Sequence, residues 1–198
     1  MDTREVGRYW ESNARAWTTL ARQGWDVYRD ALNTPAFLAL LPEIGGHSGL
    51  DIGCGDGHNT RLLAARGARM TGIDLAPTFV EHARAMEREN RLGIHYSIGS
   101  AQDLPFAAER FDFATAFMSL MDMPAPEAAL REACRVLRSG ASCSSRSRTR
   151  AFSRRTAGSA ARASSVRDPA VSPHLDGVAE RGRGCRLHDR AERRAARR

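Results

Sequence analysis

The stretch LDIGCGDG, residues 50–57, decides the fold prediction. Its first residues belong to a short apolar segment, residues 49–52, which is typical of a buried strand. The three glycines that come next are typical of a tight turn at which a ligand can approach the backbone. Residues 59–66 then have a helical pattern, and Gly67 stands at the position of a helix C-cap. The stretch therefore predicts a strand, a glycine-rich bend and a helix in succession.

The chain beyond this bend alternates between short strands and helices. The patterns predict strands at residues 49–52, 69–73, 94–98 and 111–117, and helices at residues 59–66, 77–89 and 127–137. Strand–helix alternation with short connections is typical of a parallel sheet covered by helices. We therefore expect an α/β protein with a Rossmann-like, doubly wound parallel sheet.

Residues 4–41 have a helical pattern instead. Five side chains recur at close to a 3.6-residue period and give one apolar face: Val6, Trp10, Ala14, Trp17 and Leu20. Thr34 as N-cap and Pro35 in the first turn predict the start of a further helix, which Pro42 ends. We expect residues 1–47 to form a helical cap. Its three tryptophans either pack in the core or cover a pocket, and we favour core packing.

Charge is distributed unevenly along the 198 residues, and every basic side chain is an arginine. Residues 1–140 hold 15 arginines against 18 acidic residues, whereas residues 141–198 hold 15 against five. Alanine, arginine and serine make up 35 of these last 58 residues. Such a composition buries too little apolar surface to offset the entropy of an ordered chain, so it predicts disorder in residues 141–198.

Composition also excludes some classes of protein. No apolar run approaches the roughly 20 residues of a membrane-spanning helix, and the first residues lack the pattern of a secretory signal. We therefore expect a cytoplasmic protein with no membrane partner. The four cysteines form no C-x-x-C pair, and only Cys185 has a histidine at ligand spacing, His188. We expect free thiols and no metal site.

The residues around the bend argue against a dinucleotide ligand. The pattern G-x-G-x-x-G starting at Gly53 would need glycine or alanine where His58 stands. Asp51 and Asp56 flank the bend and would repel a pyrophosphate, which a helix N-terminus otherwise attracts. Asp74 ends the second predicted strand, where a carboxylate can accept hydrogen bonds from both ribose hydroxyls; capping of the next helix is the alternative role. This arrangement favours a nucleoside that carries positive charge and no phosphate, such as S-adenosylmethionine.

Four motifs succeed one another in the middle of the chain. They are LDIGCGDG at residues 50–57, TGIDLAP at 71–77, SAQDLPF at 100–106 and FDFATAFMSLMDMPAPEAALREACRVLRSG at 111–140. In this order they resemble the class I S-adenosylmethionine-dependent methyltransferases, especially the small-molecule branch related to quinone-methylating enzymes. The resemblance covers about half of the chain and implies that residues 48–140 form the cofactor-binding core.

The resemblance implies S-adenosyl-L-methionine as cofactor and assigns residues to its methionine and ribose parts. Asp51, Gly53 and Gly55 are expected to face the methionine part, with Gly55 allowing close approach to the backbone. Phe117 is expected to border the same part. Asp74 is expected to hold the ribose hydroxyls.

The resemblance also assigns an adenine site. Leu75 is expected to pack on the adenine ring, while Ala101 and Gln102 offer groups to its edge. Ser100 departs from the family pattern, because many relatives carry an aspartate there. A hydroxyl can accept the hydrogen bond of the adenine amino group, but without charge assistance.

Methyl transfer to a small-molecule acceptor is the implied activity. The sulfonium is already an activated leaving group, so alignment supplies most of the acceleration and the sequence identifies no catalytic base. His58, His82 and Asp122 are candidates. Local capping explains His58 better and a surface position explains His82 better, whereas a helix start explains Asp122 equally well. Two alternatives stay open: a cofactor-binding remnant without catalysis, and a nucleic-acid-binding protein that uses its basic tail. Nucleic acid is the less favoured partner, and a dinucleotide oxidoreductase is the weakest interpretation.

Beyond residue 140 the sequence leaves the family pattern, in which an apolar fifth strand comes next. An arginine-rich arm, an inert tail and a frameshift are the three explanations. Codons can be chosen for residues 140–153 that, read from the third base, encode Arg-Phe-Leu-Gln-Phe-Ser-Ile-Ser-His-Pro-Cys-Phe-Gln, which resembles the family's fifth strand and the segment after it. We favour a frameshift near Gly140, in the gene or in its sequencing. The sheet would then be truncated after the fourth strand and leave an apolar edge.

Overall fold

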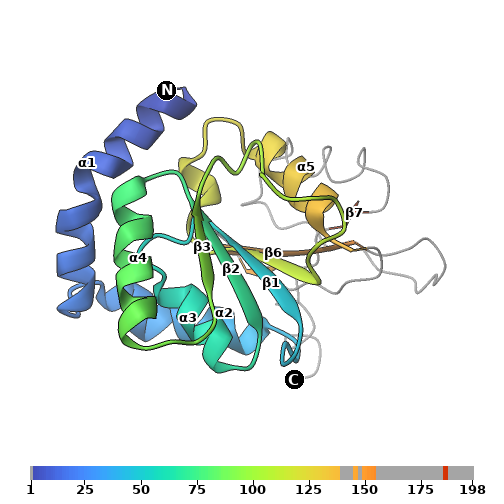
Figure 1. The fold of residues 1–198 in the computed structure, drawn as a ribbon, viewed down its shortest axis with the longest axis horizontal. Coiled ribbons are helices and arrows are strands. Elements are labelled where there is room, and N and C mark those ends of the chain that lie inside the picture. Colours follow the sequence, from blue (N-terminus) through green and yellow to red (C-terminus); the bar gives the residue numbers. More distant parts are fainter. Residues whose placement is uncertain (1, 139–144, 147–148, 155–184, 187–198) are drawn as a thin grey trace, which may run out of the picture.

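A central parallel sheet organises the protein (Figure 1). The computed structural model describes residues 2–138, 145–146, 149–154 and 185–186. Four parallel strands lie in the order β3-β2-β1-β4: β1 (Ser48–Ile52), β2 (Arg69–Asp74), β3 (His95–Ile98) and β4 (Phe113–Ala116). The predicted parallel sheet is therefore confirmed, and the strand order reverses between β1 and β4.

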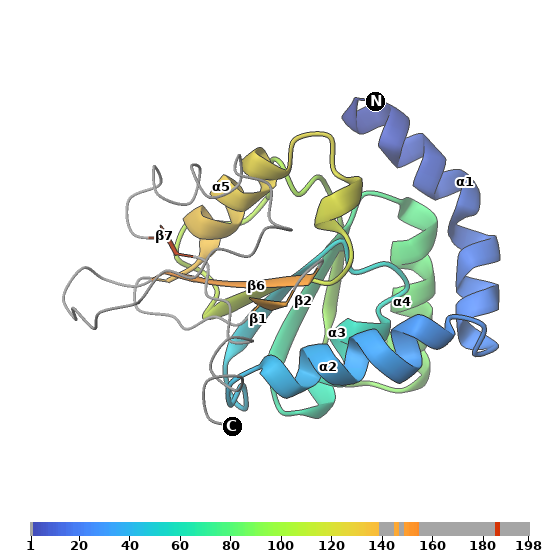
Figure 2. The ribbon, with the colours of Figure 1, turned by 180° about the vertical axis from the view of Figure 1, so that it is seen from behind.

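Helices cover both faces of this sheet. Figures 1 and 2 show α3 (His58–Ala65) and α4 (Pro77–Glu89) on one face and α5 (Pro126–Val136) on the other. Helix α4 buries Phe79, Val80 and Ala83, which lie on one side of a 3.6-residue repeat. This arrangement confirms the doubly wound, Rossmann-like α/β fold.

Glycines inside two strands accommodate aromatic rings of the neighbouring strands. Gly49 pairs with Phe113 across β1 and β4, and a Cβ at Gly49 would lie 2.3 Å from Cζ of that ring. Gly72 pairs with Tyr96 across β2 and β3, and a Cβ there would lie 2.7 Å from Cδ1 of that ring. Each ring therefore fills the space above a bare backbone, which explains glycine in the middle of a strand.

The N-terminal residues form helices before the first strand, and the last of them buries Phe37 in the main core. They are α1 (Thr3–Arg22), a π-helical turn η1 (Arg29–Asn33) and α2 (Thr34–Leu40). Helix α1 starts with a capping box of Asp2 and Glu5 and runs beside α4 in both views (Figures 1 and 2). Glu11 fastens the two helices, because its carboxylate accepts hydrogen bonds from the backbone N–H and the hydroxyl of Thr78, at 3.0 and 2.6 Å.

The prediction of Thr34 as an N-cap is wrong. The π-helical turn runs directly into α2, so Thr34 already has helical backbone angles and Asn33 precedes it. The Thr34 hydroxyl instead donates a hydrogen bond of 3.1 Å to Oδ1 of Asn59 on α3. A tertiary partner has therefore replaced the local cap that the sequence predicted.

The parallel part of the sheet ends with the fourth strand, as predicted, and an antiparallel strand that was not predicted lies beside it. Strand β6 (Thr149–Arg154) lies antiparallel to β4, with Ala114 opposite Phe152, and pairs in turn with β5 (Ser145–Arg146) and β7 (Cys185–Arg186). Backbone N–H and C=O groups along the edge of β4 attract another strand whatever side chains it carries. The disorder expected for the remainder of residues 141–198 lies outside the described residues.

Cysteine chemistry differs from the expectation at one position. Cys54 is a buried free thiol, as expected, whereas Cys134 on α5 is disulfide-bonded. Spacing in a sequence does not reveal which cysteines a fold brings together. In the described parts of the chain, no helix is long and apolar enough to cross a membrane, and no three His, Cys, Asp or Glu side chains gather as ligands for a metal ion.

Candidate functional site

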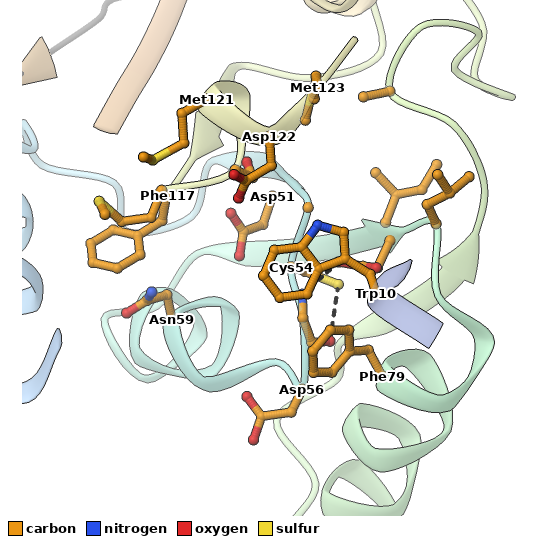
Figure 3. A pocket seen from close by; sticks show the side chains of 18 of the residues that line it. Trp10, Asp51, Cys54, Asp56, Asn59, Phe79, Phe117, Met121, Asp122 and Met123 are labelled. Atoms are coloured by element: carbon orange, nitrogen blue, oxygen red, sulfur yellow. Dashed lines mark hydrogen bonds between the residues drawn. The ribbon is translucent and has the colours of Figure 1, made fainter. Parts of the chain in front are cut away.

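One pocket lies at the carboxyl ends of β1, β2 and β4 (Figure 3). Its volume is about 430 Å³, within the range typical of small-ligand sites. Ligands of open α/β sheets bind at this edge, beside the reversal in strand order. All eight predicted site residues line the pocket: Asp51, Gly53, Gly55, Asp74, Leu75, Ala101, Gln102 and Phe117.

The glycine bend forms the floor of the pocket. The N–H groups of Gly53 and Cys54 both donate to the carbonyl of Ile73, at 2.8 and 3.0 Å, so the bend is held against β2. Gly53 and Gly55 have φ angles of 70° and 55°, in the left-handed region that favours glycine. A Cβ at Gly53 would lie 2.4 Å from Cβ of Ser119, whereas one at Gly55 would meet no atom within 4 Å. Gly53 is thus required for packing, and Gly55 leaves open space at the pocket wall.

Asp74 links the bend to the end of β2. Its Oδ2 accepts a hydrogen bond from the Gly55 N–H and its Oδ1 one from the Ala76 N–H, both at 2.9 Å. Burial raises the pKa of Asp74, although these two bonds oppose the rise. Asp74 is not the N-cap residue of α4, which is Ala76, although its carboxylate accepts the Ala76 N–H. The carboxylate therefore has a fixed position in the pocket wall and keeps free lone pairs for a ligand.

Asp51 joins three elements beneath the pocket. Its carboxylate accepts hydrogen bonds from the hydroxyls of Thr60 on α3 and Thr115 on β4, at 2.6 and 2.8 Å. The residue is 2% exposed, and burial raises the pKa of its carboxyl. These contacts hold the ends of β1 and β4 together at the point where the pocket opens.

The predicted adenine loop is closed by the N-terminal helix. The Gln102 N–H donates to Oγ of Ser100 at 3.1 Å, and the Thr3 hydroxyl donates to Oε1 of Gln102 at 2.9 Å. Gly7 allows α1 to approach Leu75, because a Cβ at Gly7 would lie 3.1 Å from its side chain. Helix α1 therefore covers the end of the pocket where Leu75 and Gln102 lie.

Sequence reasoning missed most of the residues that the cap contributes to the pocket wall. The cap contributes Thr3, Val6, Trp10, Trp17, Asp26, Tyr28, Arg29 and Asn33 to the wall. Trp10 packs 6.2 Å from the Phe79 ring, but Trp17 and Trp25 are 48% and 72% exposed, so core packing was the wrong expectation for these two. The aromatic spacing along α1 was the available signal, but it did not show which side chains would face a ligand.

The loop after β4 supplies the opposite wall. Met118 has a φ of 57°, a strained conformation for a residue with a side chain. Ser119 anchors the loop, because its hydroxyl donates to the carbonyl of Ile52 at 2.7 Å. The loop then forms the 3₁₀ turn η2 (Leu120–Asp122), and Met121 and Met123 add apolar surface to the pocket (Figure 3).

Two of the three base candidates line the pocket. Asp122 is not a helix start, since α5 begins at Pro126, and burial raises the pKa of its carboxyl. His58 does not cap α3, whose N-cap is Gly57; burial, aided by the nearby Arg29, lowers the pKa of its imidazole. His82 is half-buried on α4 and is not among the pocket-lining residues.

Residues 50–144 match the protein family described as "Methyltransferase domain". The match spans the bend, Asp74, the 100–102 loop and the loop after β4, which together make the core's part of the pocket wall. The chain contains a class I S-adenosylmethionine-dependent methyltransferase domain. This identification confirms the family resemblance of the four motifs.

Relatives of the methyltransferase domain include O-methyltransferases. The chain is 33% identical over 144 residues to the ubiquinone biosynthesis O-methyltransferase of Xanthomonas oryzae pv. oryzae, which covers 68% of the chain and 59% of the relative. It is 36% identical over 135 residues to O-methyltransferase cnsE of Penicillium expansum, covering 67% and 46%. The chain thus spans less than two thirds of the length of these relatives.

Solved structures similar to the methyltransferase domain have more than one activity. The cyclase SpnF superposes with a TM-score of 0.64 at 27% identity, over 74% of this chain and 62% of that one. An S-adenosylmethionine-dependent methyltransferase from Mesorhizobium loti superposes with a TM-score of 0.50 at 30% identity, over 54% and 49%. Because one of these proteins is a cyclase, the reaction has to be argued from the site rather than from the fold.

The pocket of the methyltransferase domain fits S-adenosylmethionine in its donor set. The described wall carries several aspartates, which suit a cationic ligand, and one of them, Asp74, has its carboxylate fixed by the Gly55 N–H. Gly55 leaves open space beside the bend for the chain of a ligand. Asp56 is partly compensated, because Nε of Arg22 lies 3.4 Å from its Oδ2. Arg22 belongs to the cap, and the sequence did not predict that it lies beside Asp56.

Proposed function

We propose that the protein transfers a methyl group from S-adenosyl-L-methionine to a small-molecule acceptor. We further propose that the cofactor is bound by the eight residues predicted from the motifs: Asp51, Gly53, Gly55, Asp74, Leu75, Ala101, Gln102 and Phe117. The observation that carries the proposal is the position of Asp74. Its carboxylate is held by the backbone of Gly55 and Ala76 at the end of β2, where the ribose hydroxyls of a nucleoside can donate to it.

The protein's own part in the reaction is alignment. When bound, the cofactor supplies a methyl group that its sulfonium already activates for transfer. The anchored bend and the loop after β4 hold the walls on both sides of the methionine part. An acceptor then enters beside Phe117, Met121 and Met123, under the helical cap. Fixed walls of this kind lower the entropy cost of bringing two reactants into line.

The acceptor in this proposal is a small organic molecule with a hydroxyl group. Two observations support it: relatives named as O-methyltransferases, one of them in ubiquinone biosynthesis, and the apolar, methionine-rich wall after β4. Methionine side chains adapt to flat aromatic ligands of differing outline. We also propose residues 1–47 as the cap, residues 48–140 as the core, and a cytoplasmic location without a nucleic-acid partner.

Calorimetry tests the cofactor proposal. We expect the purified chain to bind S-adenosylmethionine and not NAD, and Asp74→Asn to weaken this binding by about tenfold or more, since it removes a charge-assisted hydrogen bond. Glu81→Gln is the matched control, because Glu81 is exposed on the helix that begins just after Asp74. Tighter binding of NAD, or equal affinity of the Asp74 variant, would overturn the proposal.

A transfer assay separates the enzyme from a non-catalytic remnant. The cofactor labelled with tritium in its methyl group is incubated with the chain and a panel of phenols and catechols. Label in the organic extract that depends on both the protein and a phenol supports methyl transfer. Binding of the cofactor without transfer to any acceptor of the panel would favour the remnant.

A further inference from the structure

The described wall of the pocket carries more negative charge than the proposed cofactor can neutralise. It contains one arginine, Arg29, and five aspartates: Asp26, Asp51, Asp56, Asp74 and Asp122. S-adenosylmethionine has two cationic groups and one carboxylate, so it brings only one net positive charge. Negative charge in a partly closed pocket attracts cations and repels anions. The excess charge therefore favours a second ligand that is itself cationic.

Four of the five aspartates already have partners in the protein. Asp51 accepts hydrogen bonds from two threonine hydroxyls, and Asp74 accepts two from backbone N–H groups. The next two aspartates each lie beside an arginine of the cap. These pairs are Asp26 with Arg29, at 3.9 Å, and Asp56 with Arg22, at 3.4 Å. Only the fifth carboxylate is left without a partner among the described residues.

The fifth carboxylate is that of Asp122, in the loop after β4. No hydrogen bond or ion pair among the described residues uses its side chain, and burial raises the pKa of its carboxyl without a contribution from a charged neighbour there. Its backbone is held in the turn η2, because its N–H donates to the Ser119 carbonyl at 3.2 Å. Figure 3 shows Asp122 beside Met121 and Met123. A carboxylate among apolar side chains lacks the counter-ion that would offset its desolvation.

The hydroxyl group of an acceptor has a different partner in the wall, Asn59. This residue lines the pocket, is 8% exposed and lies on the same side as Phe117 in Figure 3. The Thr34 hydroxyl donates to its Oδ1 and so orients the amide, and none of the described hydrogen bonds uses its Nδ2. Nδ2 is therefore a buried donor for an uncharged oxygen. Asp122 is not needed to hold that oxygen and stays available to a charged group.

We propose that the methyl acceptor is a phenol that also carries an amine, and that Asp122 binds the ammonium group of this acceptor. The inference rests on the proposed function and names the class of acceptor within it. An ammonium group held by a carboxylate has no free electron pair, so the hydroxyl group remains the one that is methylated. Phenols that carry a carboxylate are rejected by the same negative wall.

Three catechols that differ only at the end of a short side chain test this inference. Dopamine ends in an ammonium group, 3,4-dihydroxyphenylethanol in a hydroxyl and 3,4-dihydroxyphenylacetate in a carboxylate. In calorimetry with the full chain saturated with S-adenosylhomocysteine, we expect dopamine to bind about tenfold more tightly than the alcohol, and the acetate to bind most weakly. Asp122→Asn should weaken binding of dopamine by about tenfold or more, and binding of the alcohol by less than about twofold.

Methyl-transfer rates separate recognition of charge from base catalysis. If Asp122 only binds the ammonium group, Asp122→Asn leaves kcat for the alcohol unchanged, whereas loss of a base lowers kcat for every acceptor. Asp122→Glu keeps the charge and should retain the preference for dopamine. Glu127→Gln is the matched control, because it removes a carboxylate in the first turn of α5 that lies outside the pocket wall. All affinities and rates should stay unchanged in this control.

Several results would overturn the inference. They are equal affinity for dopamine and the alcohol, equal weakening of both by Asp122→Asn, and a lower kcat for the alcohol in that variant. Binding of S-adenosylhomocysteine without binding of any of the catechols would overturn it too, while leaving the cofactor proposal intact. If the chain does not bind S-adenosylhomocysteine, the proposed function itself is wrong. Thermal unfolding shows whether each variant is folded, and the comparison of the catechols in the unaltered chain does not depend on it.

Discussion

Individual carboxylates in this protein serve different purposes according to their partners. Asp51 and Asp74 have raised pKa values because they are buried at the pocket. Glu87, near the C-terminal end of α4, has a lowered pKa instead. Burial opposes its ionisation, but the N–H groups of residues 92–94 and the guanidinium of Arg61 outweigh burial and lower its pKa. Such a residue stabilises the fold as an anion, whereas Asp51 and Asp74 are carboxylates that we propose for the cofactor.

We predict that Glu87→Gln lowers the free energy of unfolding at pH 7 by about 1–3 kcal/mol, because a charged acceptor of several hydrogen bonds is lost. The folded pKa of Glu87 lies below its usual value of 4.5, so this contribution is present above that pH and is lost as the pH falls through the folded pKa. Urea unfolding at pH 7 and pH 3 should show the difference between the two proteins shrinking. Glu89→Gln, at the exposed end of the same helix, is the control.

The two glycines of the bend should respond differently to the same substitution. Gly53→Ala should destabilise the protein by about 2–5 kcal/mol, because it combines a left-handed φ with overlap of the Ser119 side chain. Gly55→Ala should cost about 1–2 kcal/mol from its φ alone, and should weaken binding of S-adenosylhomocysteine because the new methyl occupies open space at the pocket wall. Thermal unfolding and calorimetry measure the two effects. Equal destabilisation with unchanged binding would contradict this division.

The sequence predicted the motif residues of the pocket but not their neighbours. Asp51, Gly55 and Asp74 belong to short segments whose spacing is fixed by a strand and a turn, so their meeting follows from the topology. Thr34 and Arg29 lie in the cap, and the groups that they face depend on how helices pack on a sheet. No local pattern in a sequence encodes that contact, so the cap's half of the pocket appears only in the structure.

Among the elements, the cap is joined to the core by side-chain hydrogen bonds as well as by packing. Glu11 accepts two hydrogen bonds from Thr78 at the start of α4, and Thr3 donates one to Gln102. Hydrogen bonds from Thr78 lower the pKa of Glu11, so its contribution is present above the usual pKa of 4.5 and is lost as the pH falls through the lowered value. We therefore expect acid to weaken the contact between α1 and α4.

We predict that Glu11→Ala loosens α1 without unfolding the core. Amide hydrogens of α1 (Thr3–Arg22) should exchange about tenfold faster, while those of β1 and β2 stay unchanged, because helix α1 opens as a local unit. Hydrogen exchange measured by mass spectrometry reports on both regions in one experiment. Glu5→Ala, which removes the capping box but leaves the Glu11–Thr78 contacts, should accelerate exchange only near the start of α1. Uniform acceleration across the sheet would contradict local opening.

The predicted helices and strands correspond closely to the observed ones, except at the ends of the fourth strand and at the strand beside it. The fourth strand was expected at residues 111–117 and is found at Phe113–Ala116, while Phe111 makes an isolated bridge to Leu137. Strand β6 was not expected, because its arginines and serines lack the apolar pattern of a buried strand. Hydrophobic periodicity indicates which side chains are buried. It does not indicate strand pairing that uses backbone groups alone.

The whole molecule joins a methyltransferase domain to a basic segment of unlike composition. The frameshift near Gly140 stays a prediction, and resequencing of the locus is its direct test. We expect the frame read from the third base of that codon to yield a more stable protein, because Phe, Leu and Ile would then cover β4. Each such side chain contributes about 1.5–3 kcal/mol when fully buried. A rise of several degrees in the midpoint of thermal unfolding is the expected outcome.

Expression of the two reading frames side by side provides the control for that comparison. Both chains share residues 1–139, so any difference in stability arises from the residues after position 139. A restored chain that unfolds at the same temperature as the present one would remove the physical reason for the frameshift. An uninterrupted frame with unrelated codons in the resequenced gene would end the hypothesis.

The aromatic contacts of the cap have one further consequence. Trp10 lines the pocket and meets Trp17 edge to face, with ring centroids 5.9 Å apart and planes at 90°. Indole emission depends on the polarity and rigidity of its surroundings, so a molecule entering this cavity changes the fluorescence of a side chain already present. The protein therefore carries an intrinsic optical reporter, and occupancy can be monitored in real time without attaching a dye.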